Sequence, residues 1–324
     1  MNDNVYLFLK DLFLTSELNR LPDSFGGDRI FDPPLMGVSR GDDDIFNKFK
    51  EVVAPEHHTP LEIWTSDGKW KEGDSADRLH ILSIIFPYTQ QIREESKKHN
   101  RKEWGKMPIM PADIYCVGRN YANAFMKEVI KRTMAFFEDQ GFRATAGMLS
   151  PSFQLRLQDK PPQFYSLWSE RHIAFAAGLG TFSLHEGLIT EAGCNIRVTS
   201  VITDAPLTAT PRKSDDPYAN CLFYATGECR KCEKRCPGEA ITVEGHDKVK
   251  CREYGVLVSK EMNKRFHPLL KPHERNVQGT VITSYPVGCA FCQFDVPCMD
   301  KNPMAKARKN ISSASRVQSS EKPV

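Results

Sequence analysis

Eight of the ten cysteines in this chain of 324 residues lie between residues 221 and 298, and no other feature constrains the fold as strongly. Residues 1 to 115 contain no cysteine, and Cys116 and Cys194 stand alone. Such uneven usage marks a segment whose thiols serve a purpose beyond packing. The sequence therefore predicts a separate metal-binding unit from about residue 211 to residue 300.

The redox compartment decides whether such thiols bind metal or form disulfides. The N-terminus has no basic leader, and Lys10 and Asp11 interrupt its apolar run, so we expect neither a signal peptide nor a twin-arginine signal. The longest apolar runs are far shorter than the roughly 20 residues that span a bilayer. We therefore expect a cytoplasmic protein without a membrane partner, in which cysteines are metal ligands.

The spacing of the thiols resembles the bacterial ferredoxin run C-x-x-C-x-x-C-x-x-x-C-P. The segment ECRKCEKRCP supplies the last three cysteines and the proline, but Thr226 stands where the first cysteine belongs. The later segment GCAFCQFDVPC has a gap of five residues where ferredoxins have three. Two 4Fe-4S clusters are the favoured interpretation. Structural zinc is the alternative, although zinc gives no reason for Cys-Pro followed by a short strand at GEAI.

Two-cluster ferredoxins interleave their ligands, and the same interleaving predicts the partition here. Cluster one would take Cys221, Cys229, Cys232 and Cys298, and cluster two would take Cys236, Cys251, Cys289 and Cys292. Cys221 and Cys298 are the least regular ligands. Without either of them, cluster one would be a three-iron or a labile site.

The rest of the chain alternates helical and strand patterns, which favours an α/β or α+β core. We expect an amphipathic helix at residues 5–13, strands at 78–88 and 113–118, a helix at 121–140, a short glycine-terminated helix at 171–180, and paired strands at 187–190 and 196–207. The basic, serine-rich residues 301–324 are expected to form a disordered tail.

Residues 168–207 read WSERHIAFAAGLGTFSLHEGLITEAGCNIRVTSVITDAPL. This stretch resembles the cobalamin-binding core shared by reductive dehalogenases and epoxyqueuosine reductases. The shared features are ER before a helix, AAGLG, a further glycine before LIT, Arg197, and TDAPL followed by ferredoxin-type cysteines. GRNYANAF at 118–125 resembles a stretch of epoxyqueuosine reductases, so the similarity covers about residues 110–300.

The resemblance implies a nitroreductase-like α/β core that holds base-off cobalamin, followed by a ferredoxin-like module. The implied boundaries are 1–105 for an N-terminal region that packs on the core, 106–210 for the core, 211–300 for the module and 301–324 for the tail. It also implies cofactor contacts from Gly178, Leu179, Gly180, His185 and Glu170.

The implied activity is that of an oxidoreductase in which low-potential clusters reduce cobalamin and a side chain supplies a proton. An external low-potential donor, a ferredoxin or a flavodoxin, would feed the clusters. The substrate would be a small molecule with a carbon–halogen or other carbon–heteroatom bond. Neither the substrate nor the oligomeric state is indicated by the residues.

Four residues are candidates for the chemistry. Asn120 stands where epoxyqueuosine reductases carry an aspartate, and an amide cannot donate a proton as a carboxylic acid does. Tyr121 and Tyr165 are the candidate acids, since dehalogenases use a tyrosine, with Arg171 or Arg119 stabilising a phenolate. As alternatives to catalysis, Tyr121 would pack on the core, Asn120 would cap a helix, and Arg171 would form an ion pair with Glu170.

Two other functions compete with this interpretation. One is epoxyqueuosine reduction in transfer RNA, which Asn120 and a net charge of only +3 disfavour. The other is a ferredoxin-type electron carrier without cobalamin, which would have no need of AAGLG and TDAPL.

Three further side chains are assigned ordinary roles. His57 and His58 lie in a polar stretch and are expected at the surface rather than at a metal. Cys194 is expected to be structural.

Overall fold

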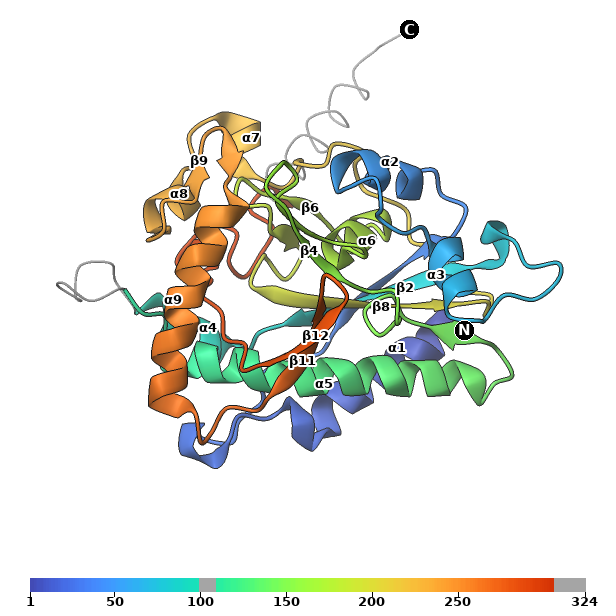
Figure 1. Cartoon of the computed structure of the whole chain (residues 1–324), viewed down its shortest axis with the longest axis horizontal. Coiled ribbons are helices and arrows are strands. Elements are labelled where there is room, and N and C mark those ends of the chain that lie inside the picture. The colour runs from blue at the N-terminus through green and yellow to red at the C-terminus, as the bar shows by residue number, and fades with distance from the viewer. Residues whose placement is uncertain (99–108, 306–324) are drawn as a thin grey trace, which may run out of the picture.

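The structure is a computed structural model that describes residues 1–98 and 109–305 (Figure 1). At its centre lies a four-stranded antiparallel sheet in the order β1-β2-β8-β3. Its strands are β1 Leu35–Arg40, β2 His80–Pro87, β8 Ile196–Thr203 and β3 Ala144–Thr145. Every residue of β2 after His80 is buried, which confirms the strand predicted at 78–88. The predicted tail falls mostly outside the described residues.

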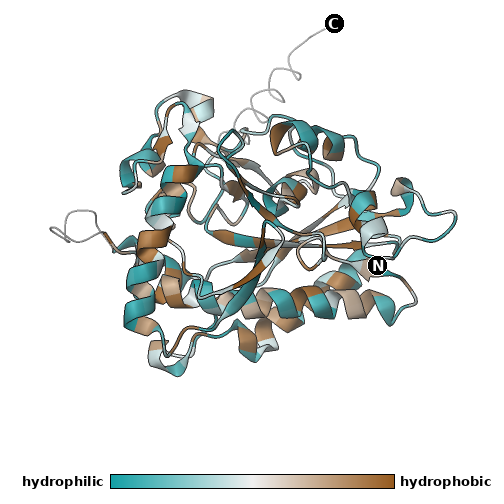
Figure 2. Ribbon diagram, viewed as in Figure 1, coloured by the Kyte–Doolittle hydropathy of each residue, from teal (hydrophilic) through white to brown (hydrophobic). Residues whose placement is uncertain are grey.

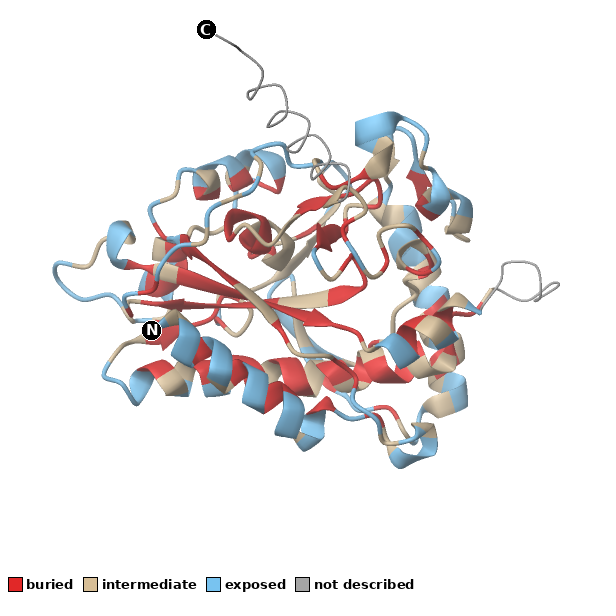
Figure 3. Cartoon of the chain, turned by 180° about the vertical axis from the view of Figure 1, so that it is seen from behind, coloured by how far each residue is buried: buried red, intermediate tan, exposed pale blue. Residues whose placement is uncertain are grey.

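Helices cover both faces of this sheet. The predicted opening helix is α1 Asn2–Thr15, which lies beside α5 Asp113–Glu138 on one face, while α6 Glu170–Ala176 lies on the other (Figure 1). The strands between them are almost wholly buried, and the outward faces of the helices are exposed (Figure 3). Apolar residues follow the same division, gathering on the strands and on the inward faces of the helices (Figure 2). The core therefore lies between the sheet and its two helical layers.

Two sequence predictions about this core are wrong. Residues 113–118 form the first turns of α5 rather than a strand, because Cys116 and Asn120 continue the buried helical face and the helix runs on through Gly118. The segments 187–190 and 196–207 do not pair with each other. The strand β7 Leu188–Thr190 pairs with β6 Gly180–Phe182, whereas β8 pairs with β2 and β3.

A second four-stranded sheet, in the order β12-β11-β4-β5, joins distant parts of the chain. Its strands are β4 Leu155–Leu157, β5 Phe164–Ser166, β11 His273–Val277 and β12 Thr280–Ser284. The distant parts are joined where β11 pairs with β4 in parallel. There the Gln278 backbone N–H donates to the Leu155 carbonyl at 3.0 Å. This sheet brings the segment after α9 (Lys248–Phe266) back to the core.

The cysteine-rich segment packs at one end of the molecule as short elements and one long helix (Figure 1). The Asp247 carboxylate caps α9 by accepting from the backbone N–H of Val249 and Lys250, at 2.9 and 3.0 Å, so Cys251 lies on the first turn. The elements are α7 Leu222–Thr226, α8 Lys231–Arg235, β9 Ile241–Thr242, β10 Gly245–His246 and α9 Lys248–Phe266.

The remaining elements complete the periphery. They are α2 Ile45–Val52, α3 Pro60–Ser66 and α4 Gln90–Lys97. The fold is a mixed α/β arrangement with several small sheets, and the predicted domain boundaries stay a prediction. Among the described residues, no helix is long and apolar enough to cross a membrane.

Candidate functional site

Two adjoining cavities form a cleft between the core and the cysteine-rich segment. Their volumes are about 640 and 510 Å³. The first lies against α2 and the second against α9, β11 and β12. Both cavities share Phe164, Tyr165, Ser166, Arg171, Glu186 and Lys248. The cleft is large enough, and apolar enough on its walls, for a sizeable organic ligand.

A charged group lies where the two cavities meet. The Glu186 carboxylate lies 3.6 Å from both His246 Nδ1 and Lys248 Nζ. Burial would raise the pKa of Glu186, but its cationic neighbours outweigh burial and lower it to about 2. Burial would likewise lower the pKa of His246, but the neighbouring Cys251 and Glu186 raise it to about 9. At neutral pH this group therefore carries two positive charges and one negative charge.

Three further arginines near the cleft have no acidic partner among the described residues. Burial, together with the smaller effect of the charge of Arg197, lowers the pKa of Arg119 to about 9. Burial and Arg197 also lower the pKa of Arg275, which lines the 510 Å³ cavity. Uncompensated charge of one sign is costly in a partly dry environment. The surroundings of the cleft are therefore suited to a negatively charged group.

One group of thiols lies at the wall of this cleft. Burial raises the pKa of Cys292, and the neighbouring Cys289, Cys251, Cys232 and Cys236 contribute to the rise. Cys251 itself lines the 510 Å³ cavity. The four cysteines predicted for cluster two therefore lie near one another, and one of them reaches the cleft. We call Cys236, Cys251, Cys289 and Cys292 the regular thiol group.

The other thiols gather around Cys232. Burial raises the pKa of Cys232 to about 12, and Cys298, Cys221 and Cys229 contribute to the rise. Thr226 points elsewhere, because it is exposed and its hydroxyl donates to the Leu222 carbonyl at 2.8 Å. The four cysteines predicted for cluster one are therefore neighbours as well. We call Cys221, Cys229, Cys232 and Cys298 the irregular thiol group.

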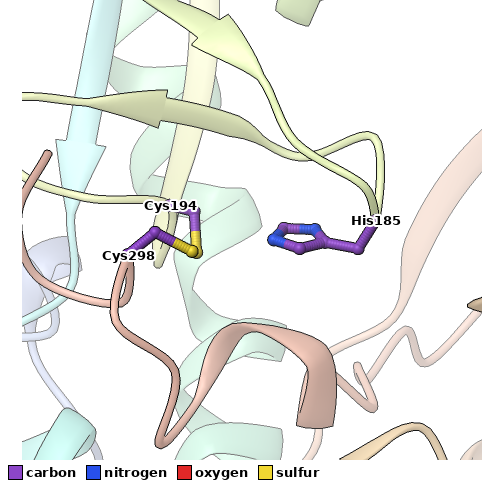
Figure 4. A group of neighbouring side chains, drawn as sticks. All are labelled: His185, Cys194 and Cys298. Carbon is purple, nitrogen blue, oxygen red and sulfur yellow. The ribbon is translucent and has the colours of Figure 1, made fainter. Parts of the chain in front are cut away.

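Cys194 and His185 join this irregular group, which the sequence did not indicate. Cys194 Sγ lies 3.7 Å from Cys298 Sγ, and the His185 ring points toward both sulfur atoms (Figure 4). The ligand atoms of the three residues lie within 4.8 Å of one another. A hydrogen bond from the Cys194 thiol lowers the pKa of Cys298 to about 5.

Tyr165 and Arg171 are the two predicted catalytic residues that line the cleft. The Tyr165 hydroxyl donates to Glu56 Oε1 at 3.2 Å. Burial and this hydrogen bond raise the pKa of Tyr165, so the phenol stays protonated at neutral pH. Arg171 Nη1 donates to the backbone carbonyl of Glu186, and Arg171 forms no ion pair with Glu170 among the described residues.

Tyr121 and Asn120 lie away from this cleft. The Tyr121 hydroxyl donates to the Leu269 carbonyl at 3.1 Å, and its ring lines a separate cavity of about 210 Å³. Asn120 is fully buried, where its side chain donates to the carbonyls of Lys271 and Pro286 and accepts from the Lys271 N–H. Asn120 lies inside α5 rather than at its N-terminus, so it holds the segment after α9 instead of capping a helix.

The glycines of AAGLG line a third cavity of about 340 Å³, together with Leu179. Packing within the chain accounts for both of them. Gly178 has a φ of +71°, and a Cβ there would lie 2.7 Å from the Pro211 carbonyl oxygen. A Cβ on Gly180 would lie 2.4 Å from the Ile189 carbonyl oxygen. Close backbone approach therefore requires glycine at both positions, whether or not a cofactor lies nearby.

Glu170 and His57 are buried near the start of α6. Burial raises the pKa of Glu170 to about 8, and its two oxygens accept no hydrogen bond in the described part of the chain. The expectation that His57 is at the surface is wrong. His57 Nε2 accepts from the Ser169 N–H at 3.0 Å and so helps to fix the start of α6, while burial lowers the pKa of His57 to about 4.

Several residues of the site lay beyond sequence reasoning. Glu56 and Arg275 come from two distant segments and belong to no recognisable motif, whereas Arg197 was among the features that carry the resemblance. Cys194 follows a glycine turn, and no spacing links it to Cys298, 104 residues away. The only hint in the sequence was Thr226, which stands where a ligand cysteine is expected. Its presence implied that this ligand comes from another part of the chain.

Comparison with known proteins gives matches among solved structures alone. No protein-family model matches the chain, and no curated protein does. Among the matching structures are epoxyqueuosine reductases and reductive dehalogenases, the two kinds of protein that the sequence resembles.

Three of these structures illustrate the likeness. Epoxyqueuosine reductase from Streptococcus thermophilus is 12% identical, with a TM-score of 0.47 over 94% of this chain and 69% of that one. Epoxyqueuosine reductase from Bacillus subtilis is 16% identical, with a TM-score of 0.44 over 93% and 70%. A catabolic reductive dehalogenase in complex with 3-bromo-4-hydroxybenzoic acid is 13% identical, with a TM-score of 0.45 over 95% of this chain and 37% of that one.

Proposed function

We propose that the protein is a cytoplasmic iron–sulfur and cobalamin-dependent reductase that cleaves a carbon–halogen or other carbon–heteroatom bond of a small molecule. The observation that carries this proposal is the position of Cys251. It belongs to the regular thiol group and also lines the cleft. An electron carried by a cluster on these thiols would therefore reach a ligand in the cleft directly.

The thiols fit iron–sulfur clusters by their number and grouping. Eight cysteines gather as two sets of four, which is the ligand count of two 4Fe-4S clusters. In this proposal the regular thiol group holds the cluster beside the cleft. The irregular thiol group holds the cluster that receives electrons from an external ferredoxin or flavodoxin.

The cleft fits cobalamin by its size and its lining. Two adjoining cavities with apolar walls offer room for a large ring, and Phe164, Lys248 and Val287 would contact it. Base-off cobalamin would supply a strongly reducing metal centre for bond cleavage. The chain itself would orient the substrate, exclude water and provide the proton.

Tyr165 is the proton donor in this proposal. Tyr165 lines both cavities, and its hydroxyl, which donates to Glu56, is protonated at neutral pH. Arg171 lines the same wall and would stabilise the phenolate that remains after proton transfer. Tyr121 lines a separate cavity, which favours Tyr165 over Tyr121 for this role.

The charge around the cleft favours a substrate with a negative group. Arg275 and Arg252 line the 510 Å³ cavity, and Arg275 has no acidic partner among the described residues. A carboxylate or phenolate on a small substrate would compensate this charge. Nucleic-acid phosphate would do so as well, and epoxyqueuosine reduction in transfer RNA is therefore an equal candidate. A ferredoxin-type carrier is the third candidate, and it leaves the cleft without a purpose.

The test is anaerobic reconstitution of the purified chain with iron, sulfide and cobalamin, followed by absorbance and EPR spectroscopy. We expect two clusters and the signal of bound base-off Co(II). Two clusters without a cobalamin signal would reject the reductase and leave the carrier. Turnover of halogenated aromatic acids, compared with turnover of an epoxyqueuosine-containing RNA stem-loop, then separates the two enzymatic candidates.

A further inference from the structure

We propose that Cys194, Cys298 and His185 form a mononuclear metal site of their own, with the donor set of a zinc ion. This inference concerns ligation within the proposed iron–sulfur protein, but the three residues stand whether or not cobalamin binds. The site would lie between the turn after β7 and the segment that ends the described chain (Figure 4).

The distance between the two sulfur atoms is the first argument. Two thiolates on one tetrahedral ion, each at about 2.3 Å from the metal, lie about 3.8 Å apart. Cys194 Sγ and Cys298 Sγ are 3.7 Å apart. Thiolates of a 4Fe-4S cluster bind different irons and so lie further from one another. The pair is therefore placed for one shared ion rather than for two corners of a cluster.

His185 supplies the second, independent argument. Its Nδ1 accepts from the Gly187 N–H at 3.2 Å, which fixes the ring. Its Nε2 is buried, yet it has no hydrogen-bond partner in the described residues. A buried ring nitrogen without a partner costs free energy. That nitrogen lies within 4.8 Å of both sulfur atoms, where a metal ion would satisfy it.

The backbone around the three residues is already rigid. The Cys194 N–H donates to the Cys298 carbonyl at 2.8 Å, and the Asn195 N–H donates to the Met299 carbonyl at 3.1 Å. Gly193 allows this contact, because a Cβ there would lie 2.3 Å from the Met299 carbonyl oxygen. Ligands held in this way lose little entropy when they bind an ion.

The donor set decides the class of ion. Two thiolates and one imidazole suit Zn²⁺ in tetrahedral geometry, with one position left for a further ligand. Such an ion would fasten the C-terminal segment to the core. It would also withdraw Cys298 from the irregular thiol group, and Cys221, Cys229 and Cys232 would then hold an iron–sulfur cluster with one corner free of cysteine.

The experiment uses Co²⁺ as a spectroscopic substitute for zinc. The full-length chain is first reconstituted anaerobically with iron and sulfide, so that cluster ligands are occupied, and is then titrated with Co²⁺. We expect one equivalent to bind with tetrahedral d–d bands and thiolate-to-cobalt charge transfer. Cys194→Ala and His185→Gln should each abolish this binding and leave the iron content unchanged. Cys116→Ala, which removes another buried thiol, should bind Co²⁺ normally.

Two results would overturn the proposal. If the wild-type chain binds no Co²⁺, the Cys194–Cys298 contact is only a hydrogen bond. If Cys194→Ala loses iron instead of Co²⁺ binding, Cys194 is a cluster ligand. Should Cys194→Ala fold poorly, His185→Gln and the wild-type titration still decide the question. A chain that binds Co²⁺ but forms no clusters would refute the proposed function and leave this site intact.

Discussion

The two thiol groups of this protein differ in how they are built. The regular thiol group keeps the ferredoxin spacing at Cys289 and Cys292 and places Cys251 at the cleft. The irregular thiol group has lost its first position to Thr226 and has gained Cys194 and His185 as neighbours. Both groups keep one C-x-x-C pair, so the difference between them lies in their surroundings: one group adjoins the cleft, and the other has further ligand-type side chains beside it.

The largest expected effect tests whether the two groups differ in function. Cys292→Ser should remove about four irons and abolish turnover, because in the proposed function the cluster beside the cleft would be the last electron carrier. Cys229→Ser should lower turnover less, since a small chemical reductant can still reach the regular group. Iron analysis and turnover with a chemical reductant measure both effects. Equal losses of turnover in the two variants would contradict the prediction that the two thiol groups differ in function.

The second prediction concerns the side chain that completes the chemistry beside the regular group. Tyr165→Phe keeps the ring and removes the proton, so turnover should fall by roughly 10² to 10⁴-fold. Tyr121→Phe is the matched control, because its hydroxyl donates to Leu269 at a separate cavity. Steady-state turnover of an identified substrate measures both variants. Similar activity of the two would show that proton supply does not come from this wall of the cleft.

The third prediction concerns Glu170, a buried residue of α6, the helix that also carries Arg171 at the cleft wall. The pKa of Glu170 is raised from its ordinary value of 4.5 to about 8 by burial. The unfolded chain therefore loses this proton at lower pH than the folded chain, and stability should fall as pH rises from 4.5 to 8. Relative to wild type, Glu170→Gln should gain on the order of 2–4 kcal/mol across this window. Urea unfolding of both proteins at several pH values measures the gain. If the difference in unfolding free energy between variant and wild type does not change with pH, the raised pKa of Glu170 is refuted.

The smallest effect isolates the contact that supports the irregular group. Gly193 has a φ of +83° and abuts the Met299 backbone, whereas Gly73 has a φ of +86° and open space. Gly73→Ala should cost about 1 kcal/mol for its conformation alone. Gly193→Ala should cost about 2–3 kcal/mol and weaken Co²⁺ binding. Thermal unfolding with and without Co²⁺ compares the two variants. Equal losses of stability in both would mean that the contact between Gly193 and the Met299 backbone is dispensable.

Sequence reasoning worked where the signal was local. The apolar run of β2 and the periodicity of α1 and α6 predicted those elements, because their residues report directly on burial. It failed at residues 113–118, where a short apolar run suits a strand and a buried helix equally. It also failed for His57, since only the packing of Trp168 and Ser169 around that ring makes a polar loop part of the core.

The sequence by itself determined that eight thiols cluster in one segment and that residues 168–207 resemble a family of reductases, because cysteine spacing and the AAGLG block can be read from nearby residues. Only the tertiary structure decided which tyrosine faces the cleft, and that Cys194 and His185 meet Cys298. Those contacts join residues that lie about a hundred positions apart in the sequence. They depend on which strands pair and which loops touch, and no local pattern records such choices.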